Sequence, residues 1–277
     1  MVEEKHRPIG IFDSGIGGVS CLGQGIKMLP NEKFIYYGDS GNPPYSLMSK
    51  TEVKKLCIDI CDFLIEKEVK AIVVACNSAT SVAITDLRKR YDIPILGMEP
   101  AVKVAVDFGS RGKIVVMATG MTLQSNTLNR LIEKYGEGFE IVKLPCRDII
   151  SLVEAGVIDG KEIEDHLREY FEEFDKETVS TVVFGCTHFG FLEKSIKKVL
   201  GDHIRIADGN EGTIRHLKDI LKKERMLNDI ERNAPAVEFY NSGGNAFIES
   251  SKRVLHKHLM NLKEKEFLDS PPQFWKA

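Results

Sequence analysis

The chain has 277 residues, 43% of them apolar, which is enough to bury the core of one large or two ordinary domains. Its 38 basic and 41 acidic residues give a net charge of −3, so no basic field favours nucleic acid or an anionic membrane surface. No apolar stretch reaches the roughly 20 residues of a membrane span, and the first residues lack the apolar segment of a signal peptide. These features predict a cytoplasmic protein that binds neither nucleic acid nor membrane.

The cysteines of a cytoplasmic chain are expected to be free thiols, because that compartment keeps thiols reduced. Cys57 and Cys61 stand four residues apart in a predicted helix over 50–68 and therefore share one of its faces. Two buried small hydrophobic residues are the favoured interpretation of this pair, and a metal site is the alternative. The sequence signals no metal and no cofactor elsewhere. The remaining cysteines are Cys21, Cys76, Cys146 and Cys186.

The first predicted strand starts at Pro8 and runs into a turn rich in glycine, in which Asp13 and Ser14 precede Gly15, Gly17 and Gly18. Glycine lets the backbone approach a ligand closely, and the N-terminus of the helix that follows attracts anions. The spacing is not that of a dinucleotide-binding loop, and an aspartate would repel a pyrophosphate. We therefore expect a small anionic or zwitterionic ligand at this turn.

Two more strands follow in the first part of the chain. The strand over 31–38 leads into a loop rich in proline and glycine, over 41–46, for which ligand contacts and a plain surface turn with a packed tyrosine are equally plausible. The strand over 71–75 ends at Cys76 and precedes a helix over 81–91. The ends of such strands are where α/β sheets place ligands.

The pattern then restarts after a predicted crossover over 93–100. Strands over 112–118, 139–145 and 178–185 repeat the first three in order, and the last of them ends at Cys186 as the third strand ends at Cys76. Three strand-turn-helix units therefore occur twice. The predicted fold class is α/β, with two pseudo-equivalent α/β domains, mainly parallel sheets and the active site in the cleft between them.

The rest of the chain is expected to return to the first half. It contains a strand over 203–208, a helix over 213–225, a strand over 236–240 and a helix over 246–259. The predicted division is a discontinuous first domain, residues 1–98 plus 207–260, a second domain over 99–206 and a C-terminal tail over 261–277. Trp275 in that tail is expected to make an interface or packing contact.

The matched cysteines allow three chemistries. A Cys/His nucleophile would use Cys186 with His188 and leave Cys76 without a role. A redox pair would need the two thiols in contact. Proton transfer by one thiol from each side of a carbon uses both, with Asp13 and His188 as neighbours that adjust thiol acidity. This scheme is racemisation, in which one thiolate removes a proton and the other thiol delivers one to the opposite face.

Seven ordered motifs between about residues 8 and 260 resemble the glutamate racemase family of the aspartate/glutamate racemase superfamily. The resemblance implies cofactor-independent interconversion of L- and D-glutamate, supply of D-glutamate for peptidoglycan, and a homodimer. The alternatives are an aspartate or hydantoin racemase of the same superfamily, or a non-catalytic regulator that binds an amino acid. The motifs contain Asp13-Ser14-Gly15, Gly38-Asp39, Pro44-Tyr45, Cys76-Asn77-Ser78, Glu99-Pro100, Glu154 and Cys186-Thr187-His188.

The resemblance also implies roles for individual residues. Cys76 would take the proton from D-glutamate and Cys186 from L-glutamate, with Asp13 and His188 as their respective assistants, and Glu154 would help to bind the substrate ammonium. Residues that match substrate-binding positions, besides Asp13, His188 and the two cysteines, are Ser14, Pro44, Tyr45, Ser46, Asn77, Ser78, Thr119, Thr122 and Thr187.

This chain departs from the family pattern at several of these positions. Ser46 stands in place of the usual glycine, Ser78 in place of threonine, and Phe189-Gly190 in place of tyrosine-proline. The two serines retain backbone or hydroxyl donors, so glutamate binding is expected to persist. Gly190 is expected to loosen the helix behind Cys186. The segment over 207–210, where the chain is expected to return to the first half, is also atypical. Activation by a cell-wall precursor is not expected, because only about seven residues precede the first strand.

Overall fold

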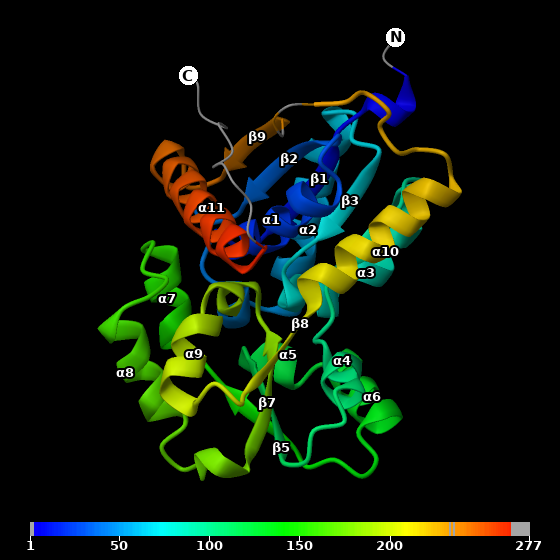
Figure 1. Cartoon of the computed structure of the whole chain (residues 1–277). Coiled ribbons are helices and arrows are strands. Elements are labelled where there is room, and N and C mark those ends of the chain that lie inside the picture. Colours follow the sequence, from blue (N-terminus) through cyan, green and yellow to red (C-terminus); the bar gives the residue numbers. More distant parts are fainter. Residues whose placement is uncertain (1–2, 233, 235, 267–277) are drawn as a thin grey trace.

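The computed structural model describes residues 3–232, 234 and 236–266. It confirms the predicted α/β class, with two sheets of parallel strands and helices packed around them (Figure 1). The first sheet has the order β4-β3-β1-β2-β9 and the second has the order β6-β5-β7-β8. The first lies in the upper part of Figure 1, and the second lies in the lower part.

The strands and helices of the first half alternate along the chain. The strands are β1 (Ile9–Asp13), β2 (Lys33–Gly38), β3 (Ala71–Val74) and β4 (Ile95–Gly97), with β9 (Ala236–Asn241) added beside β2. The helices of this half are α1 (Val19–Met28), α2 (Lys50–Glu66) and α3 (Asn77–Arg90), with α10 (Gly209–Lys223) and α11 (Asn245–Glu266) packed against α1.

The second half contains four strands and six helices among the described residues. The strands are β5 (Lys113–Ala118), β6 (Ile141–Pro145), β7 (Val179–Gly185) and β8 (Arg205–Asp208). The helices are α4 (Val102–Asp107), α5 (Gly120–Leu123), α6 (Asn126–Tyr135), α7 (Asp148–Glu154), α8 (Lys161–Tyr170) and α9 (Glu193–Leu200).

The two sheets repeat one strand order, which confirms the internal repeat expected from the sequence. Within each half the first strand lies between the second and the third, and the fourth lies outside the third, so β4-β3-β1-β2 corresponds to β8-β7-β5-β6. The strands β3 and β7, which precede the two candidate cysteines, therefore occupy equivalent places. All residues of both strands are buried, as expected of parallel strands covered by helices on both faces.

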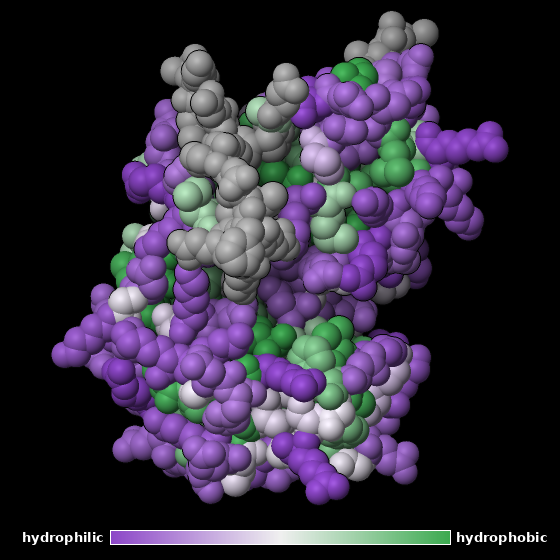
Figure 2. Space-filling model, in the orientation of Figure 1, coloured by the Kyte–Doolittle hydropathy of each residue, from purple (hydrophilic) through white to green (hydrophobic). Residues whose placement is uncertain are grey.

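The side chains of each central strand alternate between two apolar layers. In β5, Val115 and Met117 face the cluster of α7, α8 and α9, while Ile114 and Val116 face the cluster of α4 and α6. The cluster that contains Val115 also includes Ile9 and Ile11 of β1, so one apolar core continues through both halves. Figure 2 shows a mostly hydrophilic surface with scattered apolar patches on both halves.

The structure corrects three details of the predicted organisation. The strand predicted over 203–208 pairs with β7 in the second sheet and does not return to the first, because it is the fourth strand of the repeated unit. The segment predicted as a crossover contains β4, which pairs with β3 before the chain crosses. Helix α3 begins at Asn77, earlier than predicted, because the sulfur of Cys76 accepts a hydrogen bond from the amide of Ala79 and caps the helix.

The C-terminal helix is also longer than predicted. Helix α11 continues to Glu266, so the first part of the expected tail is helical. Trp275 lies outside the described residues. Because β8 belongs to the second sheet, the chain returns to the first half later than predicted. We therefore propose two domains that separate near Gly97 and after Asp208. None of the helices in the described part of the chain is long and apolar enough to cross a membrane.

Candidate active site

A hollow lies at the carboxyl ends of both sheets, where the two halves meet, and encloses about 320 Å³ including its open mouth. Cys76 and Cys186 both line it, although each follows a strand of a different sheet. Ile150 and Gly185 also line it and were not expected from the sequence. Most of the predicted site residues line this hollow: Ser14, Pro44, Tyr45, Ser46, Cys76, Asn77, Ser78, Thr119, Cys186, Thr187 and His188.

The hydrogen-bond partners of Cys76 are neutral groups. Its side chain is 6% exposed, and its sulfur lies 3.5 Å from the hydroxyl oxygen of Ser14 and 3.4 Å from the amide nitrogen of Ala79. Burial, with a smaller contribution from the charge of Asp13, raises the pKa of this thiol to about 12. The hydroxyl and the amide oppose that shift without cancelling it. Cys76 is therefore a protonated thiol at neutral pH in the empty pocket.

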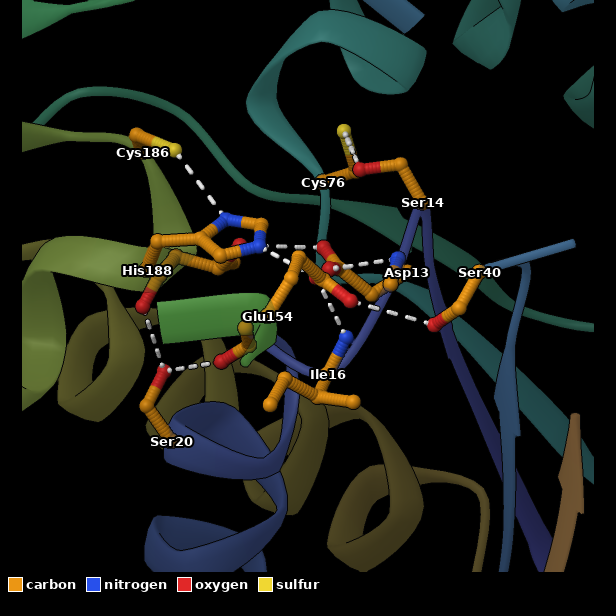
Figure 3. Close-up of polar contacts among 12 residues, drawn as sticks. Asp13, Ser14, Ile16, Ser20, Ser40, Cys76, Glu154, Cys186 and His188 are labelled. Carbon is orange, nitrogen blue, oxygen red and sulfur yellow. Dashed lines mark hydrogen bonds and ion pairs between the residues drawn. The ribbon is translucent and has the colours of Figure 1, made fainter. Parts of the chain in front are cut away.

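Cys186 has a different partner. Its sulfur lies 3.4 Å from Nδ1 of His188, and Nε2 of that ring lies 2.6 Å from Oε1 of Glu154 (Figure 3). Burial alone would lower the pKa of His188, but the charges and hydrogen bonds of Cys186 and Glu154 outweigh burial and raise it. A protonated imidazole beside the sulfur stabilises a thiolate. The second sulfur thus has a cationic neighbour, which the first sulfur lacks.

Glu154, at the end of α7, lies behind His188. One carboxylate oxygen accepts the amide of Ile16 at 2.8 Å and the other accepts the hydroxyl of Ser40 at 3.2 Å. Burial raises the pKa of this carboxyl, but His188 and these donors outweigh burial and lower it. Glu154 is therefore charged. The resemblance implied that it binds the substrate ammonium, whereas the structure directs both oxygens to protein groups and indicates that it orients His188.

Asp13, at the end of β1, is fully buried. Its carboxylate accepts the amide of Gly15 at 3.2 Å and the hydroxyl of Thr187 at 3.1 Å. Burial raises the pKa of Asp13 to about 6, opposed by the charge of His188. The thiol of Cys76 donates to the hydroxyl oxygen of Ser14 and its sulfur accepts the amide of Ala79, so neither of these hydrogen bonds involves Asp13. Asp13 acts on Cys76 through its charge, and it also binds the residue next to Cys186.

The glycines of the first turn serve a purpose that the sequence did not reveal. A side chain at Gly15 would collide with the carboxylate of Glu154, and one at Gly17 would meet His188 and Thr187 at 2.6 Å. Gly15 and Gly17 therefore make room for side chains of the other half. Ser14 of the same turn lines the hollow, and a ligand at this turn stays a prediction. The missing signal was the pairing of residues more than a hundred positions apart.

The opposite wall of the hollow carries hydroxyl and amide groups. Ser78 lies 3.0 Å from the hydroxyl of Thr119 and 3.4 Å from that of Thr122, which places Thr122 behind the lining residues. Oδ1 of Asn77 is buried without a hydrogen-bond partner, so it is an acceptor that a bound N–H group can use. In the loop after β2, the hydroxyl of Tyr45 donates to Asp39 at 2.7 Å and the residue lines the hollow, so the ligand contacts considered for this loop stay a prediction.

The remaining cysteines lie outside the hollow. All six cysteines are free thiols in the structure, as expected. Cys57 and Cys61 are fully buried in the apolar cluster of α2 and α3, which fits small hydrophobic residues. Within the described ranges there is no cluster of three or more His, Cys, Asp or Glu side chains that could hold a metal ion.

Two thiols at the ends of equivalent strands, in one hollow between two α/β halves, define an amino-acid racemase. The chain belongs to the Asp/Glu/hydantoin racemase family, whose model matches residues 27–217. It is similar to a glutamate racemase of Clostridium botulinum (strain Alaska E43 / Type E3), with 42% identity over 92% of this chain and 99% of the relative.

Two solved structures extend this similarity to the fold. Glutamate racemase from Francisella tularensis, in complex with D-glutamate, has a TM-score of 0.76 at 29% identity, covering 92% of this chain and 94% of that one. Escherichia coli glutamate racemase, in complex with L-glutamate and the activator UDP-MurNAc-ala, has a TM-score of 0.80 at 27% identity, covering 91% and 95%.

Proposed function

We propose that this enzyme interconverts L- and D-glutamate without a cofactor, by proton transfer between substrate and two thiols. The observation that carries the proposal is that Cys76 and Cys186 line a single hollow from different sheets. The curated relatives and the solved structures described above are glutamate racemases, two of them with a glutamate enantiomer bound. The hydroxyl groups and the free acceptor of Asn77 suit the two carboxylates and the ammonium of glutamate.

The proposed mechanism starts from a thiolate at Cys186 and a thiol at Cys76. The thiolate removes the α-proton of L-glutamate, the electron pair of that C–H bond stays on carbon, and Cys76 donates its proton to the opposite face. D-Glutamate leaves, and the two sulfurs have exchanged protonation states. The reverse sequence starts from D-glutamate with Cys76 as base. His188 stabilises charge at Cys186, while Ser14 and Asp13 surround Cys76.

The test follows the α-proton of glutamate directly. Purified enzyme is incubated with L-glutamate in D₂O, and optical rotation and deuterium at the α-carbon are measured, with L-aspartate in a parallel reaction. Loss of rotation with deuterium uptake from glutamate is expected. Turnover of aspartate alone would point to another racemase of the family, and no turnover of either would point to a binding protein.

The two thiols are tested by single substitutions. Cys76→Ala and Cys186→Ala are each expected to abolish racemisation, because each removes the group that serves one face. Cys146→Ala is the matched control, since Cys146 is buried outside the hollow. Racemisation at the wild-type rate in either active-site variant would overturn the two-thiol scheme.

We further propose that the product D-glutamate supplies peptidoglycan synthesis in the cytoplasm and that the enzyme is a homodimer, as the family resemblance implies. The biological role is tested by rescue of a bacterial strain that needs added D-glutamate. The oligomeric state is tested by light scattering of the purified chain. Failure to rescue by an enzyme active in vitro would contradict the biological role alone.

A further inference from the structure

A line of side-chain hydrogen bonds leads from the edge of the first sheet to the sulfur of Cys186. Nδ2 of Asn241, at the end of β9, donates to the hydroxyl oxygen of Ser40 at 3.1 Å. The hydroxyl of Ser40 donates to Oε2 of Glu154 at 3.2 Å, and Oε1 of Glu154 lies 2.6 Å from His188. His188 contacts Cys186, and Figure 3 shows the inner part of this line.

The direction of each hydrogen bond is set by the groups around it. Oδ1 of Asn241 accepts the amide of Gly243 at 2.7 Å, which leaves the amide nitrogen of the side chain to face Ser40. Ser40 has a single hydroxyl proton. Since its oxygen accepts from Asn241, that proton is directed to the carboxylate of Glu154. The amide thus orients the hydroxyl, and the hydroxyl orients the carboxylate.

The carboxylate of Glu154 is held from the opposite half of the molecule. Glu154 ends α7 in the second half, whereas Ile16, Ser40 and Asn241 belong to the first. A carboxylate with a fixed position keeps the Nε2–H of His188 directed to itself and leaves Nδ1 to Cys186. Small displacements of such a group reduce proton-transfer rates, because the reacting atoms need a narrow range of distances.

We propose that Ser40, oriented by Asn241, is a positioning residue for proton transfer at Cys186 and has no comparable effect at Cys76. This inference rests on the proposed racemisation of glutamate. Neither residue lines the hollow, and both act through Glu154. The alternative is a purely structural role, in which the two residues only join the halves of the molecule. Proton transfer at both sulfurs would then slow together.

Deuterium isotope effects separate these two roles. The free energies of the two enantiomers in solution are equal, so any variant must lower kcat/KM by the same factor in both directions. If transfer at Cys186 becomes the slow step, deuterium at the α-carbon slows the reaction of L-glutamate strongly. The reaction of deuterated D-glutamate is then slowed little, because its deuterium is removed by Cys76 in a fast earlier step.

The experiment measures kcat/KM and both isotope effects in the full chain. Ser40→Ala is expected to lower kcat/KM about ten- to hundredfold, the size of one lost hydrogen bond to a charged group. The isotope effect with deuterated L-glutamate is expected to rise above the isotope effect with deuterated D-glutamate. Ser40→Thr retains the hydroxyl and is expected to restore the wild-type values. Ser242→Ala is the matched control, since Ser242 accepts the amide of Gly41 in the same region without contacting Glu154.

Asn241→Asp provides a second variant if Ser40→Ala folds poorly. The new carboxylate still accepts the amide of Gly243 but draws the hydroxyl of Ser40 away from Glu154. The isotope effect is therefore again expected to be larger for deuterated L-glutamate than for deuterated D-glutamate. Equal isotope effects with reduced kcat/KM, or unchanged kcat/KM in both variants, would overturn the inference. Absence of turnover in the wild-type enzyme would instead reject the proposed function.

Discussion

The two reactive sulfurs differ in their immediate neighbours, although they end equivalent strands. Cys76 has a serine hydroxyl and a backbone amide, while Cys186 has a histidine that is itself held by a glutamate. Burial keeps the first sulfur protonated, because its neutral neighbours only partly oppose the rise in pKa. The second sulfur instead lies beside an imidazole whose pKa is raised, so the two sulfurs have different electrostatic surroundings.

Replacement of His188 tests this asymmetry at the residue scale. His188→Asn removes the cation beside Cys186, so kcat/KM is expected to fall about a hundredfold or more, the usual contribution of a positioned acid or base. The fall should be equal in the two directions, and the isotope effect should become larger for L-glutamate than for D-glutamate. A larger effect for D-glutamate would assign His188 to the other sulfur.

The raised pKa of Asp13 leads us to expect that activity depends on pH. Burial raises its pKa to about 6, so the carboxylate is charged above that pH and neutral below it. Only the charged form accepts the hydroxyl of Thr187 well, and we expect kcat/KM of the wild type to fall as pH decreases through about 6. Because the pKa is raised on folding, this group favours the folded state below the ordinary carboxyl range and loses that contribution as pH rises.

The control for this pH dependence is Asp13→Asn. Its kcat/KM is expected to be lower throughout and to lack the step near pH 6. Rate profiles of both proteins from acid to neutral pH make the comparison. A step of the same size in the variant would show that another group titrates there.

At the scale of single elements, the turn after β1 joins the two halves of the site. Its glycines lie against Glu154 and His188, and its amides bind Asp13 and Glu154. The matching turn after β5 also contacts the other half, since the hydroxyl of Thr119 lies 3.0 Å from that of Ser78. The geometry at Cys186 therefore depends on a turn that lies far from it in the chain.

Gly15→Ala tests the turn. A β-carbon there would collide with Glu154, so either the turn or the carboxylate must move. We expect kcat/KM to fall at least about tenfold and the free energy of unfolding to fall by about 1–3 kcal/mol, as in other overpacked sites. Enzyme assays and urea denaturation provide the measurements.

Gly212→Ala is the matched control for that substitution. Gly212 lies in α10, and nothing lies within 4 Å of an added β-carbon. Replacement of a helical glycine by alanine is expected to raise stability by about 0.5–1 kcal/mol and to leave activity unchanged. Equal behaviour of the two variants would mean that Gly15 has no special contact.

The sequence predicted the elements better than their contacts. Strand-turn-helix units, their repetition and the place of both cysteines follow from local patterns of apolar residues and turns, and the structure confirms them. Ser40, Asn241 and the position of Glu154 were missed, because their roles depend on groups brought together from distant parts of the chain. The strand predicted over 203–208 was assigned to the wrong half because the segment over 93–100 was interpreted as a crossover. Recognition of β4 in that segment would have predicted a matching fourth strand in the second half.

At the scale of the whole molecule, the halves are joined by a common apolar core and by two chain crossings. Helix α10 follows the second crossing and packs on α1, so the end of the chain closes over the first half. At the opposite end of the first sheet from the hollow, the buried amine of Lys70 binds Glu32 at 2.6 Å and the carbonyls of Lys5 and Met226. These contacts join Lys70 to three distant segments of the chain.

Lys70→Met tests that contact. The substitution leaves the charge of Glu32 buried without its cationic partner, although the amide of Asn228 still donates to its other oxygen at 2.8 Å. The free energy of unfolding is therefore expected to fall by about 3–5 kcal/mol. Activity of the folded variant should be unchanged, because Lys70 precedes β3 and the hollow lies after it. Urea denaturation makes the measurement. A double variant, Lys70→Met with Glu32→Leu, should recover part of the loss, and no recovery would show that the carbonyl contacts dominate.

The shared strand order of the two sheets bears on how such an enzyme could arise by evolution. A half-length polypeptide with one cysteine after its third strand, associated with an identical copy, would already present two sulfurs to one ligand. Fusion of two such genes frees each copy to acquire different neighbours, a histidine beside one sulfur and a serine beside the other. The chemical distinction between the sulfurs is then a later specialisation of an ancestral homodimer.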